Sequence, residues 1–187
     1  MSLGDDFDRT IEAAREGEHD ALEAIYRDLA PVVLGYLRGQ GADEPEDLAS
    51  EVFVAVVRGL AFFHGDERAF RSWVFTIAHR RLVDERRRRA RRPEDLVDPG
   101  DIAGRLEEVR TGDAEAEAFE RLGTSWAMGA IGRLTPEQRE VVLLRVLGGL
   151  PVAEVATVMG KAEGAIKALQ RRALRTLARE IEREGVS

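Results

Sequence analysis

The residues best suited to chemistry lie between positions 70 and 92, where aromatic side chains come directly before a run of arginine. Trp73 and Phe75 flank an apolar stripe with helical spacing, and six of the seven residues from 86 to 92 are arginine. Aromatic rings beside a basic helical face can stack on unstacked bases while the cations neutralise phosphates. On this segment alone, a core helix with a solvated basic end is an equally good interpretation.

Helical periodicity places these groups on two faces of one helix. Apolar residues recur every three or four positions and form the expected buried face: Phe70, Val74, Ile77 and Ala78. Polar residues of the same segment fall on the opposite side: Ser72, Thr76, His79 and Arg80. The segment therefore predicts a helix that packs on one side and offers polar, aromatic and basic groups on the other.

Composition sets broad limits on the protein class. The chain has 187 residues, 44% of them hydrophobic, which suffices for a packed core in one domain or two small ones. It contains no cysteine, and its three histidines have no metal-ligand spacing, so we expect no disulfide, metal or cofactor. No apolar run is long enough to span a bilayer, and the acidic N-terminus lacks a signal-peptide core. We therefore expect a soluble cytoplasmic protein.

The net charge of −7 hides a strong segregation along the chain. Residues 1–51 carry 4 basic and 14 acidic groups, and residues 93–120 carry 2 and 10. Residues 80–92, in contrast, carry 8 basic and 2 acidic groups, and residues 121–187 carry 11 and 7. The acidic average does not exclude nucleic acid as a partner, because two blocks of the chain are basic.

Strand signals are almost absent, so the predicted fold class is all-α. Before the organising helix we expect three others: one capped by Asp8 and ending near Gly17, one over residues 19–38, and one that begins at Pro45. On this third helix Asp47 and Glu51 lie four positions apart. Like charges at that spacing are unfavourable in an isolated helix, so they indicate either a basic partner surface or a solvated acidic face.

Residues 93–120 combine proline, glycine and many carboxylates, which is typical of a flexible acidic linker. We therefore expect two helical domains, over residues 1–92 and 121–187, joined by this linker.

The second domain has the pattern of a helix-turn-helix. Thr135 to Gln138 is a capping-box start with proline at the first helical position. Further on, Gly160 suits the turn and Ile166 suits the core of two crossing helices. The second of these helices directs polar side chains outward: Lys167, Gln170, Arg171 and Arg175. Such residues can contact base edges and phosphates in a major groove, although a helical hairpin with a solvated basic face is the alternative.

Together these blocks resemble the extracytoplasmic-function (ECF) group of bacterial sigma factors, the two-domain relatives of sigma-70. The segment EDLASEVFVAVVRGL is similar to the helix that this family uses against RNA polymerase, and FRSWVFTIAHRRLVDERRRR is similar to its promoter-melting helix. The segment LTPEQREVVLLRVLGGLPVAEVATVMGKAEGAIKALQRRALRTL resembles sigma region 4. The resemblance covers nearly the whole chain except the linker.

The resemblance implies a sigma factor with no enzymatic activity, which binds core RNA polymerase, directs it to promoters and initiates DNA melting. The residues it implies for docking on the β′ clamp helices of the polymerase are Asp47, Leu48, Glu51 and Phe53. Those implied for the minus-ten element are Phe62, Phe63, His64, Asp66, Trp73, Thr76, Arg80, Arg86 and Arg87. Those implied for the minus-thirty-five element are Lys161, Glu163, Lys167, Gln170, Arg171, Arg172 and Arg175.

The implied partners are core polymerase, through its β′ clamp helices and β flap, promoter DNA, and an anti-sigma factor that covers the polymerase-binding surfaces. No membrane insertion is implied. We expect the linker to let the two domains pack together when inhibited and separate on polymerase. Four positions depart from the family pattern. Ser50 stands where glutamine is usual, Arg80 where asparagine is common, Pro151 where a serine cap is usual, and Lys161 where an aliphatic residue is typical. Lys161 is therefore interpreted as an extra phosphate contact.

Other function classes fit the sequence less well. A free-standing helix-turn-helix regulator would bind duplex DNA without polymerase, but it would not need the acidic docking helix or the aromatic face. An enzyme acting on nucleic acid would need a catalytic set, a metal cluster or a phosphate-binding glycine loop, and the sequence contains no such pattern. A purely structural adaptor is disfavoured by the confined basic blocks. The free-standing regulator is therefore the main alternative.

Overall fold

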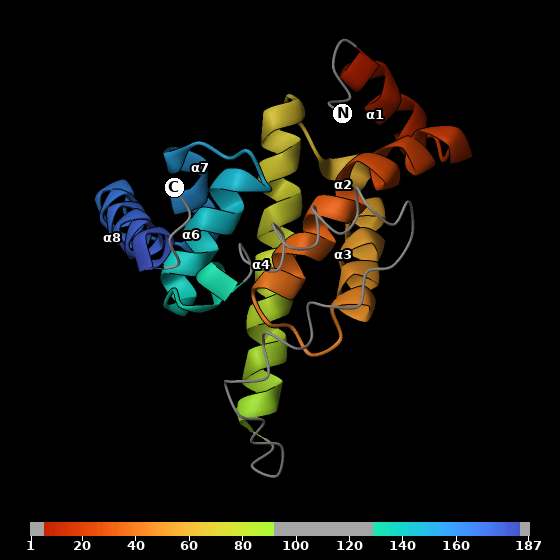
Figure 1. Cartoon of the computed structure of the whole chain (residues 1–187). Coiled ribbons are helices and arrows are strands. Elements are labelled where there is room, and N and C mark those ends of the chain that lie inside the picture. The colour runs from red at the N-terminus through yellow and green to blue at the C-terminus, as the bar shows by residue number, and fades with distance from the viewer. Residues whose placement is uncertain (1–5, 92–128, 184–187) are drawn as a thin grey trace, which may run out of the picture.

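The computed structural model describes residues 6–91 and 129–183, which form helices joined by turns (Figure 1). The elements of the first half are α1 (Phe7–Arg15), α2 (His19–Gly39), α3 (Pro45–Gly59), the short 3₁₀ helix η2 (Leu60–Phe62) and α4 (Glu67–Ala90). Those of the second half are α6 (Pro136–Val146), α7 (Val152–Met159) and α8 (Glu163–Arg183). The prediction of an all-α fold is confirmed. The linker predicted over residues 93–120 lies outside the described residues.

The core of the first half lies where α2, α3 and α4 meet. Leu29 and Val33 of α2, together with Val52 of α3, are fully buried at the spacing that the sequence predicts for these helices. The α4 side chains that complete this core include two fully buried rings, Phe70 and Phe75. Periodicity predicted the burial of Phe70. The prediction that Phe75 flanks the stripe near the surface is wrong, because its ring packs edge to face on Tyr36 of α2.

The start of α1 differs from the prediction. Asp6 rather than Asp8 occupies the N-cap position, and its side chain makes no capping hydrogen bond. The intervening Phe7 is buried and packs against Phe70 of α4, with ring centroids 5.7 Å apart. Because the buried Phe7 is the first residue of α1, Asp8 lies in the first turn of the helix. There its charge complements the helix dipole.

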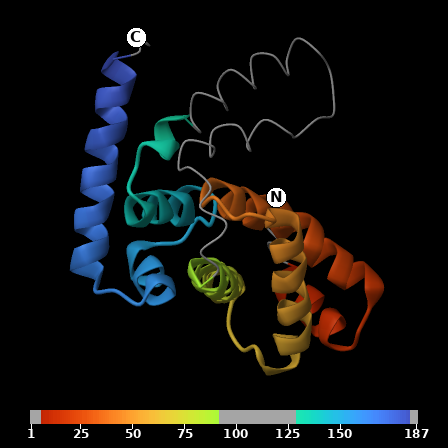
Figure 2. The same cartoon turned by 90° about the horizontal axis from the view of Figure 1, so that it is seen from below.

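The helix α4 is buried on two sides rather than one. Figure 2 shows it end-on at the centre of the molecule, with α3 on one side and α6 and α7 on the other. Ser72, which periodicity placed on the open face, is buried, and Thr76 and His79 are half-buried. The prediction of an open polar face is therefore wrong for the middle of α4, because the second half of the chain covers it. Arg80 remains exposed.

The second half contains the predicted helix-turn-helix. Thr135 and Gln138 form the expected capping box at the start of α6. α7 ends at Gly160, whose φ of 62° is a left-handed conformation that favours glycine. From α8, Ile166 and Leu169 are buried in the core, as their spacing predicted. These contacts set α7 and α8 in a fixed relation to each other.

Most of the buried hydrophobic residues of both halves belong to one continuous core. α6 comes close to α2 at two glycines one helical turn apart. A Cβ atom at Gly39 would lie 2.8 Å from Cδ1 of Leu143, and one at Gly35 would lie 3.3 Å from Cδ1 of Leu147. This close approach seats α6 and α7 against the first half and leaves α8 on their far side (Figure 2).

Candidate nucleic-acid interface

The connection between α3 and α4 points one aromatic ring outward and another inward. Phe62 is 84% exposed, whereas Phe63 is 8% exposed. The ring of Phe63 stacks on that of Trp73, with centroids 5.3 Å apart and planes inclined by 28°. Gly59 permits this, because a Cβ atom there would lie 2.7 Å from the Trp73 ring. A base can therefore reach Phe62 and the exposed part of Trp73, while Phe63 supports Trp73 from inside.

Polar groups next to these rings have partly structural roles. Asp66 caps α4, since its side chain accepts a hydrogen bond of 2.8 Å from the backbone N–H of Ala69. The hydroxyl of Thr76 donates to the backbone oxygen of Ser72 at 2.8 Å. Trp73, Thr76 and Arg80 follow one another at helical spacing and share a face, on which Arg80 is exposed. His64, in the connection before α4, is also exposed.

The arginine run at the end of α4 is partly engaged within the molecule. Arg86 donates to the backbone oxygen of Gln40 at 2.7 Å and to its side-chain oxygen at 2.9 Å. Arg87 is exposed and lies 3.7 Å from Asp84 in a loose ion pair. Arg87 is therefore placed to meet a phosphate, whereas Arg86 also ties α4 to the end of α2.

The predicted docking helix α3 separates its four candidate residues by burial. Asp47 and Glu51 are exposed, and Glu51 lies 3.7 Å from Arg81 of α4. Leu48 and Phe53 are buried and belong to the core. The exposed stripe of α3 therefore presents carboxylates, while the two apolar candidates support it from within.

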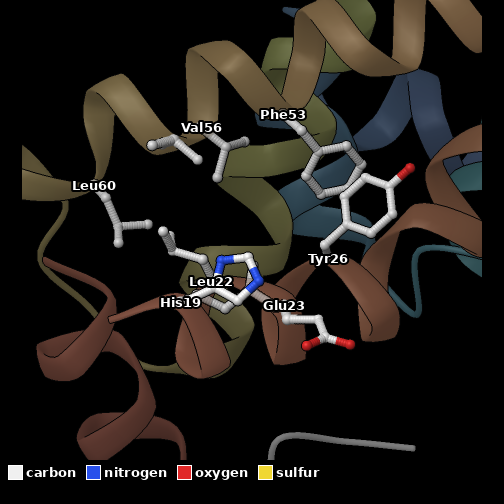
Figure 3. A pocket seen from close by; sticks show the side chains of 9 residues that line it. His19, Leu22, Glu23, Tyr26, Phe53, Val56 and Leu60 are labelled. Carbon is white, nitrogen blue, oxygen red and sulfur yellow. The ribbon is translucent and has the colours of Figure 1, made fainter. Parts of the chain in front are cut away.

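An open apolar groove of about 320 Å³ lies between α2 and α3 (Figure 3). Its lining comprises His19, Leu22, Glu23, Ile25, Tyr26, Phe53, Val56, Val57 and Leu60. The rings of Tyr26 and Phe53 meet edge to face at 4.8 Å, and Tyr26 and Val57 are about half exposed. An exposed apolar groove of this kind suits a helix of a partner protein.

The helix α8 carries the outward-facing cations of the helix-turn-helix. Four of its candidate residues are exposed and basic: Lys167, Arg171, Arg172 and Arg175. Glu163 is exposed at the helix start and lies 3.5 Å from Lys167, while Gln170 is half-buried. In the turn, Lys161 pairs with Glu137 at 2.8 Å. The structure does not bring this set together with the α4 set, because α6 and α7 lie between them (Figure 2).

A polar cluster joins the two halves beneath these surfaces. The buried carboxylate of Glu140 in α6 accepts a hydrogen bond of 2.8 Å from the hydroxyl of Tyr36 in α2. The same carboxylate oxygen contacts Nδ1 of His79 in α4. Nearby, Arg71 pairs with Asp28 at 3.0 Å and lies 3.5 Å from the backbone oxygen of Gly148. These polar contacts fix the register of α6 on α2 and α4.

The cluster perturbs the ionisation of its members. Burial by itself would raise the pKa of Glu140, but the hydrogen bonds and charges of His79, Tyr36 and Arg86 outweigh it and hold that pKa below the ordinary value. Burial, followed by the charge of Glu140, raises the pKa of Tyr36 well above its usual range. The carboxylate is therefore stabilised as an anion between the two halves.

Sequence reasoning missed this cluster. Glu140 and Tyr36 are 104 positions apart, so no local spacing connects them. The available signal was that each interrupts an otherwise apolar helical face, and buried polar groups require partners. That signal indicates a partner without identifying it.

Two negative findings apply to residues 6–91 and 129–183. Within these ranges, no group of three or more histidine, aspartate or glutamate residues is arranged to hold a metal ion. No helix in the same ranges has the length and apolar character needed to cross a membrane.

Comparison with protein families matches both halves of the chain. Residues 23–92 match the family model described as Sigma-70 region 2, and residues 125–177 match the model described as Sigma-70, region 4. The two matches occur in this order and together span most of both described segments.

Relatives of known identity are similar over most of the chain. BldN of Streptomyces coelicolor, an ECF RNA polymerase sigma factor, is 40% identical over 171 residues, which is 90% of this chain but only 63% of BldN. ShbA of Streptomyces griseus, also an ECF sigma factor, is 31% identical, with 90% of each chain covered. SigD of Mycobacterium tuberculosis, of the same class, is 30% identical over 97% of this chain and 87% of its own length.

Solved structures share the fold. CnrH, solved in complex with the cytosolic domain of CnrY, has a TM-score of 0.63 at 21% identity and covers 95% of this chain and 98% of its own. The sigma factor RpoE of Bartonella quintana, solved with the anti-sigma factor NepR, has a TM-score of 0.65 at 22% identity over 86% of this chain and 98% of its own.

Proposed function

The chain belongs to the ECF sigma factors of the sigma-70 family, and from this membership we propose that it binds core RNA polymerase, directs it to specific promoters and begins DNA melting. The observation that carries the proposal is the presence of both sigma regions in one chain and in order. A free-standing regulator would need only the helix-turn-helix, so that alternative is not favoured. Sigma factors are initiation factors without chemistry of their own, and this chain is consistent with that class.

The proposed division of labour follows the two halves. Residues 1–92 dock on polymerase and melt the minus-ten element, residues 121–187 read the minus-thirty-five element, and residues 93–120 link them. The docking surface combines the exposed carboxylates of Asp47 and Glu51 with the apolar groove floored by Phe53. In this proposal the carboxylates meet basic groups of the β′ clamp helices, and the groove accepts apolar side chains.

Melting is assigned to the end of the molecule where η2 meets α4. Phe62 and the exposed part of Trp73 stack on a base that has left the duplex, and His64, Asp66, Thr76 and Arg80 surround it. Arg87 holds a phosphate of the non-template strand, and Arg86 joins it once it leaves Gln40. The buried Phe63 contributes through its stack with Trp73.

Upstream recognition is assigned to α8. Arg171 and Arg172 read base edges in the major groove with the partly exposed Gln170, while Lys167 and Arg175 hold phosphates. Lys161 contacts a phosphate near the turn once it leaves Glu137, and Glu163 lies at the start of the reading helix.

Promoter binding requires the two halves to separate. The positions that name the minus-ten and minus-thirty-five elements differ by about 25 base pairs, so at about 3.4 Å per base pair the two elements lie about 85 Å apart on B-form DNA. A compact chain of this length has a radius of gyration of only about 16 Å. The shared core of α2, α4, α6 and α7 must therefore open when the chain engages both elements.

An anti-sigma factor is the proposed partner of the inactive state. CnrH and RpoE, which share the fold, were solved with CnrY and NepR, respectively. By analogy, such a partner covers the α2–α3 groove and stabilises the packed halves. We expect the chain to act in the cytoplasm, where bacterial RNA polymerase is found.

The proposal is tested by co-purification with bacterial core RNA polymerase, followed by run-off transcription on promoter fragments selected by the complex. Stoichiometric binding and promoter-dependent transcripts are expected. Retention of duplex DNA without any polymerase binding would contradict the proposal and favour the free-standing regulator.

A further inference from the structure

The loop that presents Phe62 is fastened by a residue far from it in sequence. Arg15, at the end of α1, donates from Nε to the backbone oxygen of Leu60 at 3.3 Å and from Nη2 to the backbone oxygen of Phe63. Its remaining terminal nitrogen pairs with Glu12, one turn earlier on α1, at 2.7 Å. The planar guanidinium thus holds two carbonyls of the loop at once, as its fixed fork of donors allows.

The two anchored carbonyls stand on either side of the exposed ring. Leu60 and Phe63 are buried, whereas Phe62 between them is 84% exposed. An aromatic side chain surrounded by water gains nothing from that position in the isolated protein, and a loose loop could turn it inward. Fixing the backbone before and after Phe62 keeps the ring outward and reduces the ordering needed when a ligand stacks on it.

The same loop supports the second ring of the site. Phe63 packs on Phe70 as well as on Trp73, with centroids 5.1 Å and 5.3 Å apart, and Phe7 of α1 closes the cluster through Phe70. α1 therefore contacts the site in two ways: through the charge-assisted hydrogen bonds of Arg15 to the loop backbone, and through the packing of Phe7 on Phe70. Figure 1 shows α1 at the same end of the molecule as the start of α4.

We propose that Arg15 is a positioning residue for base capture. It holds the η2 loop so that Phe62 and Trp73 together receive the unstacked base of the non-template strand. α1 lies outside the segment that matches the Sigma-70 region 2 model, which begins at residue 23, so this assigns to α1 a part in promoter melting. The inference rests on the function proposed above.

The matched pair of variants is Arg15→Met and Arg9→Met. Arg9 lies on the same helix, is exposed and pairs with Asp6 at 3.0 Å. Each variant is assembled with core polymerase and measured for binding to a labelled single-stranded oligonucleotide carrying the non-template minus-ten sequence, and separately to duplex minus-thirty-five DNA. Arg15→Met should weaken single-strand binding about tenfold and flatten base preference at the captured position, whereas Arg9→Met should behave as wild type. Duplex binding should be unchanged in both.

Two further variants separate positioning from folding. Arg15→Lys keeps the charge and stem and should retain part of the single-strand affinity. In a Phe62→Ala background, Arg15→Met should cause little additional loss, because the two residues act on one contact.

The inference is overturned if Arg15→Met matches Arg9→Met in single-strand binding, if its loss is undiminished in the Phe62→Ala background, or if Arg15→Lys, assembled normally with polymerase, binds with unaltered affinity and base preference. Failure of the wild-type chain to bind polymerase or the oligonucleotide would instead overturn the proposed function.

Discussion

Arg171 illustrates how an exposed cation can carry sequence information. It lies on the outer face of α8 among other basic residues, so burial alone does not distinguish a base contact from a phosphate contact. Arg171→Ala should cost about 1–3 kcal/mol of promoter affinity and relax base preference at one upstream position. Lys161→Ala, which removes a proposed phosphate contact, should instead weaken binding to all DNA sequences alike. It should also reduce by about one the slope of log affinity against log salt concentration. Binding to a library of minus-thirty-five sequences at several salt concentrations distinguishes these results, and identical profiles would contradict the assignment.

Asp47 tests the docking surface at the same scale. Its side chain is exposed on α3, so a reversal of charge should leave the core intact. Asp47→Arg should reduce core polymerase binding by at least tenfold, because a cation would then face the basic partner surface. Glu182→Arg makes the same charge change at an exposed site on α8 and serves as the control. Pull-down with core polymerase gives the comparison, and equal retention of the two variants would contradict the docking role.

The sequence indicated which residue types belong to the candidate sites, but not which of those residues are exposed. The acidic, aromatic and basic candidates could be selected by type and spacing, but spacing could not reveal that Phe63 supports Trp73 from inside. Likewise, Leu48 and Phe53 are buried beneath the acidic stripe of α3. A mixed helical face contains both surface and supporting residues, and only the packing of neighbouring helices separates them.

At the scale of elements, the N-terminus of α4 combines a structural and a functional role in one carboxylate. Asp66 caps the helix through the N–H of Ala69 and is also a candidate for contact with the minus-ten element. Asp66→Ala should lower the free energy of unfolding by about 1 kcal/mol, whereas Asp66→Asn should restore most of it, because asparagine caps nearly as well. Urea unfolding measures the stability, and equal losses for both variants would contradict the capping role.

Activity of the same pair separates the second role. If Asp66→Asn retains stability but loses open-complex formation, the charge itself contacts the DNA or a neighbouring group. If it retains both, capping accounts for the residue.

Helix positions followed from the sequence because periodicity, proline and turn glycines are local signals. The starts of α3 at Pro45 and of α6 after Thr135 agree with the structure, as does the turn at Gly160. The two differences arose from packing between elements. With Phe7 buried, α1 begins before the predicted cap Asp8. On α4, a face predicted to be exposed is covered by α6 and α7.

At the scale of the whole molecule, the contact between halves had no sequence signal strong enough to predict its geometry. Gly35 could be read as an ordinary residue of the helix predicted over residues 19–38, and Gly39 as the start of the loop after it, until Leu147 and Leu143 were found against them. Glu140 could be read as a surface carboxylate until Tyr36 and His79 surrounded it. Such pairings depend on tertiary contacts over about a hundred residues, which periodicity cannot encode.

The ionisation of Glu140 makes the packed state sensitive to acid. Its pKa in the folded chain is lowered by His79, Tyr36 and Arg86 despite burial. The carboxylate therefore stabilises the fold at pH values above 4.5, the ordinary pKa of glutamate. This contribution should be lost as the pH falls from about 4.5 through the lowered folded-state pKa. Urea unfolding between about pH 6 and about pH 3.5 should show a smaller loss of stability for Glu140→Gln than for the wild type. Parallel pH profiles would show that Glu140 is not the responsible group.

The contacts of Glu140 with Tyr36 and His79 also stabilise the packed arrangement of the two halves, so a substitution of Glu140 should favour their separation. Glu140→Ala leaves Tyr36 and His79 without their shared acceptor, and loss of hydrogen bonds to a charged group costs about 2 kcal/mol. If polymerase binds only the separated form, this shift should raise apparent polymerase affinity by up to about 30-fold. Glu137→Ala, exposed one turn earlier on α6, is the control and should have no such effect.

Because the chain has no cysteine, the change can be followed with dyes on Asp20→Cys and Glu182→Cys, two exposed positions on α2 and α8. Energy transfer should be higher in the free wild type than in Glu140→Ala, and should fall in both when core polymerase is added. Transfer that is unchanged on polymerase would show that the halves remain packed there, and the spacing of the promoter elements would then have to be met by bending the DNA. Equal transfer in Glu140→Ala and Glu137→Ala would show that the cluster does not hold the halves together.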